Sequence, residues 1–240
     1  MAKTDLIDSR KGLELFQLQQ TLPLEKNVLQ EVYAIPQVNQ ELKRLTRQRR
    51  RLVNERVSYI NTLQSDLRAS SLGLVEITKD VKNVWYLNFL SSSKDLRLLA
   101  KKNKRSLLSI KQVGEKYVEA ILQWQKQAVF SDDIIFMSPM ILQDVNRIIA
   151  LRKMIKEIDH QIILRLEQSD IGQRLLTIKG FGVTCCAELA AETGCIERFE
   201  KESSLALYIG MVALDNSSTP QVNIKEVKRQ NRLIAMLKWR

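Results

Sequence analysis

The chain has 240 residues, of which 45% are hydrophobic, and only 8 glycines and 4 prolines are spread through it. This composition can bury a core and excludes a chain that is disordered throughout. The net charge of +11 and the isoelectric point near 9.6 indicate a polyanionic partner, most simply nucleic acid. An anionic membrane surface is the alternative, but we expect no stretch to approach the roughly 20 apolar residues of a spanning helix.

The start of the chain has no apolar signal core, so we expect a cytoplasmic protein. Three cysteines, two of them adjacent at Cys185 and Cys186, do not make a disulfide framework. Adjacent cysteines are poorly spaced as zinc ligands, so we expect buried small side chains instead. We expect His160 to be a partly exposed helix residue.

Residues 3–20 are predicted to open the chain with a helix that carries Asp5 and Asp8 one turn apart. Two carboxylates on one face can hold Mg²⁺, which prefers oxygen ligands. Acidic residues in a first helical turn are also favourable with the helix dipole, so the spacing alone leaves both interpretations open.

Apolar residues at helical spacing predict a long helix over residues 37–69, after a linker punctuated by Pro23 and Pro36. Its basic run, over residues 43–56, consists of Lys43, Arg44, Arg47, Arg49, Arg50, Arg51 and Arg56. Such a run could neutralise several phosphates and bind nucleic acid in a salt-dependent way. The alternative is a basic face that acidic residues balance elsewhere in the fold.

Further helices are predicted over residues 79–90, 94–102 and 106–128, after a break at residues 70–73. Another long helix should reach about residue 168, with Pro139 in its first turn. Its near-heptad apolar spacing indicates pairing with a second long helix, in the same chain or in a partner, so a coiled-coil homo-oligomer is expected.

Two glycines, Gly180 and Gly182, separate an apolar helical end from a small-residue helix predicted at residues 183–192. Glycine lets the backbone turn sharply and leaves the first N–H groups of the next helix uncovered. These groups and the helix dipole can seat a phosphate, as in a helix–hairpin–helix that grips a nucleic-acid backbone. A plain helical hairpin with a glycine break is the alternative.

The segment from residue 175 to residue 219 resembles the C-terminal domain of the insertion-sequence-110 transposases, which are bridge-RNA-guided recombinases with an acidic DEDD tetrad. Lys179, Cys195, Ala213 and Thr219 depart from the family pattern, where Pro, Asp, Pro and Gly stand. The matching residues are Leu175, Ile178, Gly180, Gly182, Ala187, Leu189, Ala190, Glu192, Gly194, Phe199, Leu205, Ala206, Tyr208 and Gly210.

The resemblance implies that Ser218 is the nucleophile that attacks a DNA phosphate, with Ser217 as the second candidate. The segment KTDLIDSR resembles the family segment whose two aspartates belong to the metal-binding tetrad, which makes Asp5 and Asp8 ligands of Mg²⁺. The other two acids of the tetrad belong to an RNase-H-like nuclease domain that we expect this chain mostly to lack. A guide RNA is implied for a full-length member, and Lys225 and Lys228 would hold phosphate by their position.

These observations predict a mainly α fold with three regions. Residues 1–20 are expected to be a remnant of the nuclease domain, residues 21–168 a helical coiled-coil region, and residues 169–240 a compact C-terminal domain with the hairpin and the serine loop. The predicted function is a DNA transposase, here in a truncated and inactive form. The alternative is a non-catalytic helical protein that binds nucleic acid or regulates it. The expected nucleic-acid contacts are Lys179, Gly180, Gly182, Arg44, Arg47, Arg50, Arg51, Lys225 and Lys228.

Overall fold

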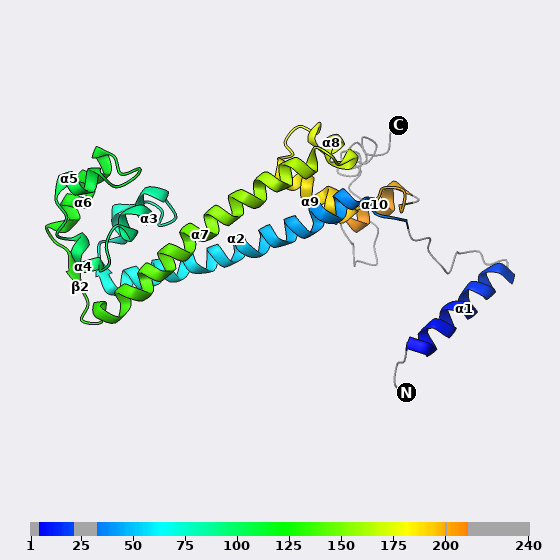
Figure 1. The fold of residues 1–240 in the computed structure, drawn as a ribbon, viewed down its shortest axis with the longest axis horizontal. Coiled ribbons are helices and arrows are strands. Elements are labelled where there is room, and N and C mark those ends of the chain that lie inside the picture. Colours follow the sequence, from blue (N-terminus) through cyan, green and yellow to red (C-terminus); the bar gives the residue numbers. More distant parts are fainter. Residues whose placement is uncertain (1–4, 22–32, 200, 211–240) are drawn as a thin grey trace, which may run out of the picture. The chain divides into compact units, whose positions relative to one another are not determined.

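The computed structural model describes residues 5–21, 33–199 and 201–210 (Figure 1). The described chain is mainly helical, as predicted, and two short strands are the exception. Its contacts form two compact units: Glu41–Gln168, here called the hairpin unit, and Met1–Gln40 with Ser169–Arg240, here called the C-terminal unit. The first helix, α1 (Asp5–Thr21), agrees with the predicted helix at the start of the chain.

Two long antiparallel helices, α2 (Gln37–Ser70) and α7 (Ile134–Leu166), carry the hairpin unit (Figure 1). Three ion pairs join them, each with an N–O distance of 2.5 Å. The residue numbers of the α7 partners fall as those of the α2 partners rise, as expected for antiparallel helices. The pairs are Glu41 with Arg165, Arg49 with Asp159, and Glu55 with Arg147. The long helix predicted over residues 37–69 is confirmed, and its partner lies in the same chain.

A cluster of shorter helices packs against the far ends of α2 and α7 around a core that includes Tyr86, Phe89 and Trp124. The elements are α3 (Val84–Ser91), α4 (Leu96–Leu99), α5 (Lys104–Leu108), α6 (Glu115–Gln125), the 3₁₀ helix Val75–Ile77, and the strands β1 (Ser71–Leu72) and β2 (Val129–Phe130). The strands pair antiparallel, with Ser71 opposite Phe130 and Leu72 opposite Val129.

Three of the predicted helical boundaries in this cluster are wrong. The helix predicted over residues 106–128 is two helices, because the chain turns through Gln112 at a φ of 68° and restarts after Gly114. The helix predicted from residue 79 begins only at Val84, since Asp80 accepts a hydrogen bond from the Lys82 N–H within a preceding turn. Asp95 caps α4 by accepting from the Arg97 N–H, which shortens the helix predicted over residues 94–102.

Pro139 lies inside α7 and not in its first turn, because the helix starts five residues earlier than predicted, at Ile134. The carbonyl that Pro139 cannot satisfy belongs to Ile135, a residue that is 58% exposed, so solvent can satisfy it. The neighbouring Ser138 is buried, and its hydroxyl accepts a hydrogen bond from the Leu96 N–H at 2.9 Å. The carbonyl that lacks its helical partner therefore belongs to a residue at the surface and not in the core.

By length and hydropathy alone, α7 could cross a membrane, contrary to the expectation that no stretch would qualify. Within the hairpin unit its apolar side is used for packing: α7 contacts α3 and α4, and Ile141, Val145 and Ile148 are fully buried. Arg147 and Arg165 pair with acidic residues of α2. The core therefore explains part of the apolar composition of α7, while Ile135, Phe136 and Met140 on the same helix are exposed.

The C-terminal unit contains α8 (Asp170–Leu176), α9 (Val183–Thr193) and α10 (Glu202–Tyr208). A chain of buried hydrogen bonds centres on Asn39, which is 2% exposed. Its amide Nδ2 donates to the Gly194 carbonyl at 2.7 Å, and its Oδ1 accepts from the Ser169 hydroxyl at 2.7 Å. That hydroxyl accepts in turn from the Gly172 N–H and caps α8. One side chain therefore fixes the start of α8 and the end of α9.

Replacing Asn39 by Ala should lower the free energy of unfolding of the C-terminal unit by about 1–3 kcal/mol, because it strips buried polar groups of their partners. Calorimetric unfolding of the full chain measures this change. The control is Asn54→Ala, since Asn54 is an exposed asparagine on the same helix. Equal melting curves for the two variants would contradict the role given to Asn39.

Candidate nucleic-acid interface

The α8–α9 turn exposes both glycines that the sequence singled out. Gly180 adopts a φ of 99°, which side chains other than glycine rarely adopt, while Gly182 is extended at φ −82° and ψ 159°. A Cβ at either position would meet no atom within 4 Å among the described residues. Gly180 is therefore needed for the backbone turn, whereas Gly182 leaves open space in front of α9.

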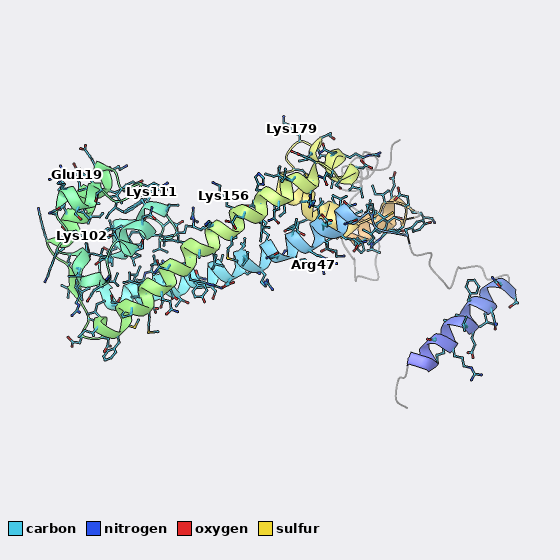
Figure 2. The ribbon with its side chains drawn as sticks, viewed as in Figure 1. Arg47, Lys102, Lys111, Glu119, Lys156 and Lys179 are labelled. Atoms are coloured by element: carbon cyan, nitrogen blue, oxygen red, sulfur yellow. The ribbon has the colours of Figure 1, made fainter. Side chains whose placement is uncertain are left out.

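The N-terminus of α9 is suited to an anion. Gly182 is the residue before the helix, and its carbonyl accepts from the Cys186 N–H at 3.0 Å. No side chain caps the helix and its first turn has no acidic residue within the described chain. The first N–H groups and the positive end of the helix dipole thus have no competing carboxylate. Lys179 is exposed in the same turn and adds a positive charge (Figure 2).

The arginine run on α2 divides into two sets. The four predicted contacts, Arg44, Arg47, Arg50 and Arg51, are all exposed and form what we call the arginine stripe. Arg44, Arg47 and Arg51 follow the spacing i, i+3, i+7 that keeps side chains on one helix face, over about 10 Å of helix axis. Within the described chain, Arg44 and Arg51 form no ion pair. Figure 2 labels Arg47 on this helix.

The remaining arginines of the run are less exposed. Arg49 pairs with Asp159 of α7, and Arg56 is only partly accessible. The alternative of a basic face balanced by acids holds for Arg49. Arg44 and Arg51 are exposed, so contact with phosphate stays a prediction for them.

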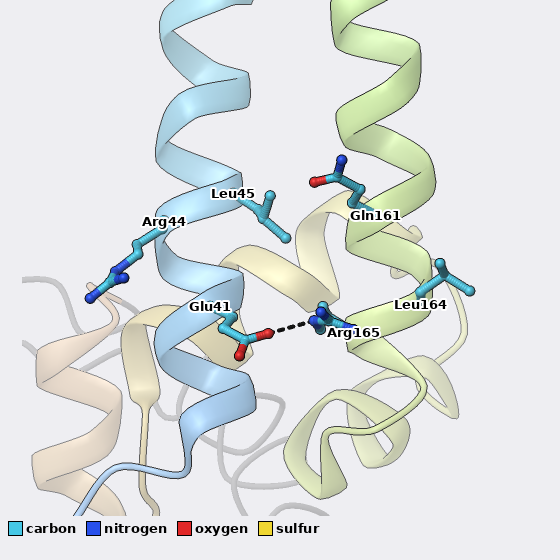
Figure 3. A pocket seen from close by; sticks show the side chains of 6 residues that line it. All are labelled: Glu41, Arg44, Leu45, Gln161, Leu164 and Arg165. Atoms are coloured by element: carbon cyan, nitrogen blue, oxygen red, sulfur yellow. Dashed lines mark hydrogen bonds and ion pairs between the residues drawn. The ribbon is translucent and has the colours of Figure 1, made fainter.

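A cleft of about 280 Å³ lies between α2 and α7, next to the start of the arginine stripe (Figure 3). The Glu41–Arg165 ion pair closes one end of it, and Leu45 and Leu164 give it apolar walls. Figure 3 shows Arg44 extending away from α7 on the outer side of α2. This leaves the Arg44 guanidinium directed to solvent, where it could reach a phosphate.

The predicted catalytic and metal residues are not brought together in the described part of the chain. Asp5 and Asp8 lie one turn apart on α1, where the structure describes the backbone but not these side chains. Ser217, Ser218, Lys225 and Lys228 lie outside the described residues. No group of three His, Cys, Asp or Glu side chains suited to a metal occurs among the residues that were described.

The cysteine prediction is half correct. Cys186 is buried, but Cys185 is exposed, because adjacent side chains on a helix point about 100° apart. Cys195, which stands where the family has an aspartate, donates to Glu197 Oε2 at 2.5 Å. Burial, with the carboxylate of Glu197 beside it, raises the pKa of the Cys195 thiol. His160 is exposed, as expected, and takes part in no such cluster.

Sequence reasoning missed one arrangement, which orders the end of the described chain. The guanidinium carbon of Arg198 lies 4.6 Å from the ring centre of Phe199 and 4.3 Å from that of Tyr208. The Tyr208 hydroxyl donates to the Glu192 carbonyl at 3.0 Å. These contacts hold α10 to α9 just before the segment that carries Ser218. An arginine beside an aromatic residue in the sequence gives no indication of the second ring.

Residues 172–235 match the family described as Transposase IS116/IS110/IS902. The matched segment covers the α8–α9 turn, α10 and Ser218. No curated protein and no solved structure matches the chain.

Replacing both Arg44 and Arg51 by Gln should weaken binding to duplex DNA and reduce the slope of log affinity against log salt by about 2, one for each phosphate that the variant no longer neutralises. Fluorescence anisotropy at several salt concentrations measures both quantities. The control with the same charge change is Lys116→Gln with Lys126→Gln, two exposed lysines at and after α6. An equal slope for the two double variants would rule out the arginine stripe as a specific contact.

Replacing Gly182 by Asp should change stability and DNA affinity in opposite directions. Aspartate is a better residue than glycine before a helix, so the free energy of unfolding should rise by a few tenths of a kcal/mol. The added carboxylate would repel a phosphate at the same place, so DNA affinity should fall about tenfold. Gly182→Ser is the neutral control. Thermal unfolding and anisotropy measure the pair of effects, and unchanged affinity would contradict the phosphate seat.

Proposed function

We propose that the chain is a DNA transposase of an insertion sequence that cuts and rejoins strands through a serine, because residues 172–235 match the Transposase IS116/IS110/IS902 family. The family match carries the proposal, because it spans both the exposed glycine turn and Ser218. The net charge of +11 supports a polyanionic substrate.

We assign DNA binding to two surfaces, one in each unit. The α8–α9 turn offers the N-terminus of α9 with Lys179, a form of contact that holds a phosphate without reading a base. The arginine stripe offers side chains that are open to solvent, and arginine matches the geometry of phosphate oxygens. Both contacts are to the backbone, so neither by itself selects a target sequence.

Ser218 is the proposed nucleophile and Ser217 the second candidate. The Ser218 hydroxyl oxygen attacks a backbone phosphorus, forming a serine–phosphate ester while the bond from phosphorus to a deoxyribose oxygen breaks. The serine proton passes to a base and the departing oxygen gains a proton. Attack by the departing oxygen of another strand reverses the step and rejoins the DNA. A serine hydroxyl is a weak nucleophile, so a base, a cation or a metal must activate it. Lys225 and Lys228 are proposed to hold the phosphate.

Asp5 and Asp8 are proposed as two of the carboxylate ligands of Mg²⁺, which would stabilise charge on the reacting phosphate when bound. Their spacing on α1 places the two backbone positions one turn apart, which suits carboxylates that share an ion. Two carboxylates supply only part of the oxygen ligands that Mg²⁺ takes. The remaining acids of the tetrad would come from a nuclease domain. We also propose that a full-length member uses a guide RNA, that the protein forms a homo-oligomer, and that it is located in the cytoplasm.

A second candidate function is a non-catalytic protein that binds nucleic acid or regulates transposition. The observation that favours it is the exposed arginine stripe, which can bind a phosphate backbone without Ser218 or a metal. Covalent chemistry separates the two functions, since only the transposase forms a bond to DNA.

Replacing Ser218 by Ala should remove any covalent protein–DNA product, reducing it by about 10³-fold or more, because alanine lacks the hydroxyl oxygen that forms the ester. The measurement is a denaturing gel of the full chain incubated with Mg²⁺ and labelled DNA from both sides of its coding sequence. Ser217→Ala should retain the product. A product that survives in Ser218→Ala would move the nucleophile elsewhere, and its absence in the unsubstituted chain would favour the non-catalytic function.

A further inference from the structure

Three arginines and one aspartate lie within two helical turns of one another midway along the α2–α7 hairpin. Arg49 of α2 and Asp159 of α7 form an ion pair with an N–O distance of 2.5 Å, and their side chains are 24% and 39% exposed. Arg56 lies two turns further along α2, and Arg152 two turns earlier along α7. Three guanidinium groups and one carboxylate leave a surplus of positive charge at this level of the hairpin.

The antiparallel register places Arg56 opposite Arg152. Seven residues bring a helix back to nearly the same face, so Arg56 shares the inward face of Arg49, and Arg152 that of Asp159. Because the helices run in opposite directions, a step of two turns from the Arg49–Asp159 pair reaches Arg56 on α2 and Arg152 on α7 together. The positive charges of Arg56 and Arg152 therefore face each other, whereas the neighbouring contacts between the two helices are ion pairs of opposite charge.

The donors of this pair are incompletely satisfied. The Arg56 Nε is buried and has no hydrogen-bond acceptor among the described residues. Arg152 donates from Nη1 to the Lys82 carbonyl at 3.0 Å, a neutral acceptor that leaves its charge uncompensated. Burial, and then the charges of Arg152 and Arg49, lower the pKa of Arg56, against the opposite influence of Asp159. A buried donor without an acceptor is unfavourable, and an anion would relieve both this and the repulsion.

We propose that Arg56 and Arg152, with Arg49 beside them, form a binding site for a phosphate group on the α2–α7 hairpin. Guanidinium groups present paired N–H donors that match phosphate oxygens, and both arginines are partly accessible, so a ligand can enter. The phosphate belongs either to a free anion or to a nucleic-acid backbone. The site goes beyond the function proposed above, since it needs neither Ser218 nor a metal and its residues are separate from the arginine stripe.

Thermal unfolding of the full chain tests for the free anion, with phosphate compared with chloride at equal ionic strength. Phosphate should raise the melting temperature of the unsubstituted chain by about 2 °C or more. It should have the same effect on the control Lys116→Gln and no effect on Arg56→Gln or Arg152→Gln. Without phosphate, Arg56→Gln should be at least as stable as the unsubstituted chain, because it removes a like-charge contact.

Binding of a 20-base-pair DNA duplex, followed by anisotropy, tests for a backbone phosphate. Arg56→Gln should weaken binding about tenfold more than Lys116→Gln does, and Arg56→Lys should fall between them because it keeps the charge but not the paired donors. A difference from the control in either experiment supports the site and identifies the source. Equal behaviour of variant and control in both would overturn it, as would a melting temperature of Arg56→Gln several degrees below that of the unsubstituted chain without phosphate. Ser218-dependent chemistry is measured separately, so failure here leaves the proposed function standing.

Discussion

The hydrogen bonds of Asn39 are the constraint on which the C-terminal unit depends. A single buried amide satisfies the carbonyl at the end of α9 and the hydroxyl that caps α8. Gly194, which supplies that carbonyl, adopts a φ of 68° and lies against Ile35, so that a Cβ would come within 3.1 Å of it. Buried polar groups are stable only when each has its partner. The helix pair is therefore fixed at the start of α8 and at the end of α9. The turn that connects the two helices needs no further contacts and stays exposed.

An exposed turn on a fixed support is what a phosphate contact requires. A ligand binds more tightly when the groups that contact it are already ordered in the free protein. Here the helix already positions the N–H groups at the start of α9. Arg198 adds to this order because its guanidinium lies over the rings of both Phe199 and Tyr208, which holds α10 in place. The segment that leads to the proposed nucleophile thus begins from a packed element.

In the hairpin unit too, side chains between elements have partners, whereas side chains on the outside are exposed. Arginines that lie between α2 and α7 meet the carboxylates of Asp159, Glu55 and Glu41 level by level, except where Arg56 faces Arg152. Arginines of α2 that face away from α7 are open to solvent. One sequence run is therefore divided between two environments: inward residues form ion pairs with the facing helix, and outward residues leave a positively charged surface.

The sequence by itself determined the mainly α fold, the long α2, the glycine turn and the family resemblance of residues 172–235, because helical periodicity, glycine chemistry and a contiguous motif are all local properties. It did not determine the break between α5 and α6, the start of α7 or the exposure of Cys185, because these depend on turns and packing that weak helix propensities do not decide. Only the tertiary structure decided which arginines of one run are paired and which are exposed. That choice depends on the partners that α7 brings alongside α2, and no spacing within α2 contains this information.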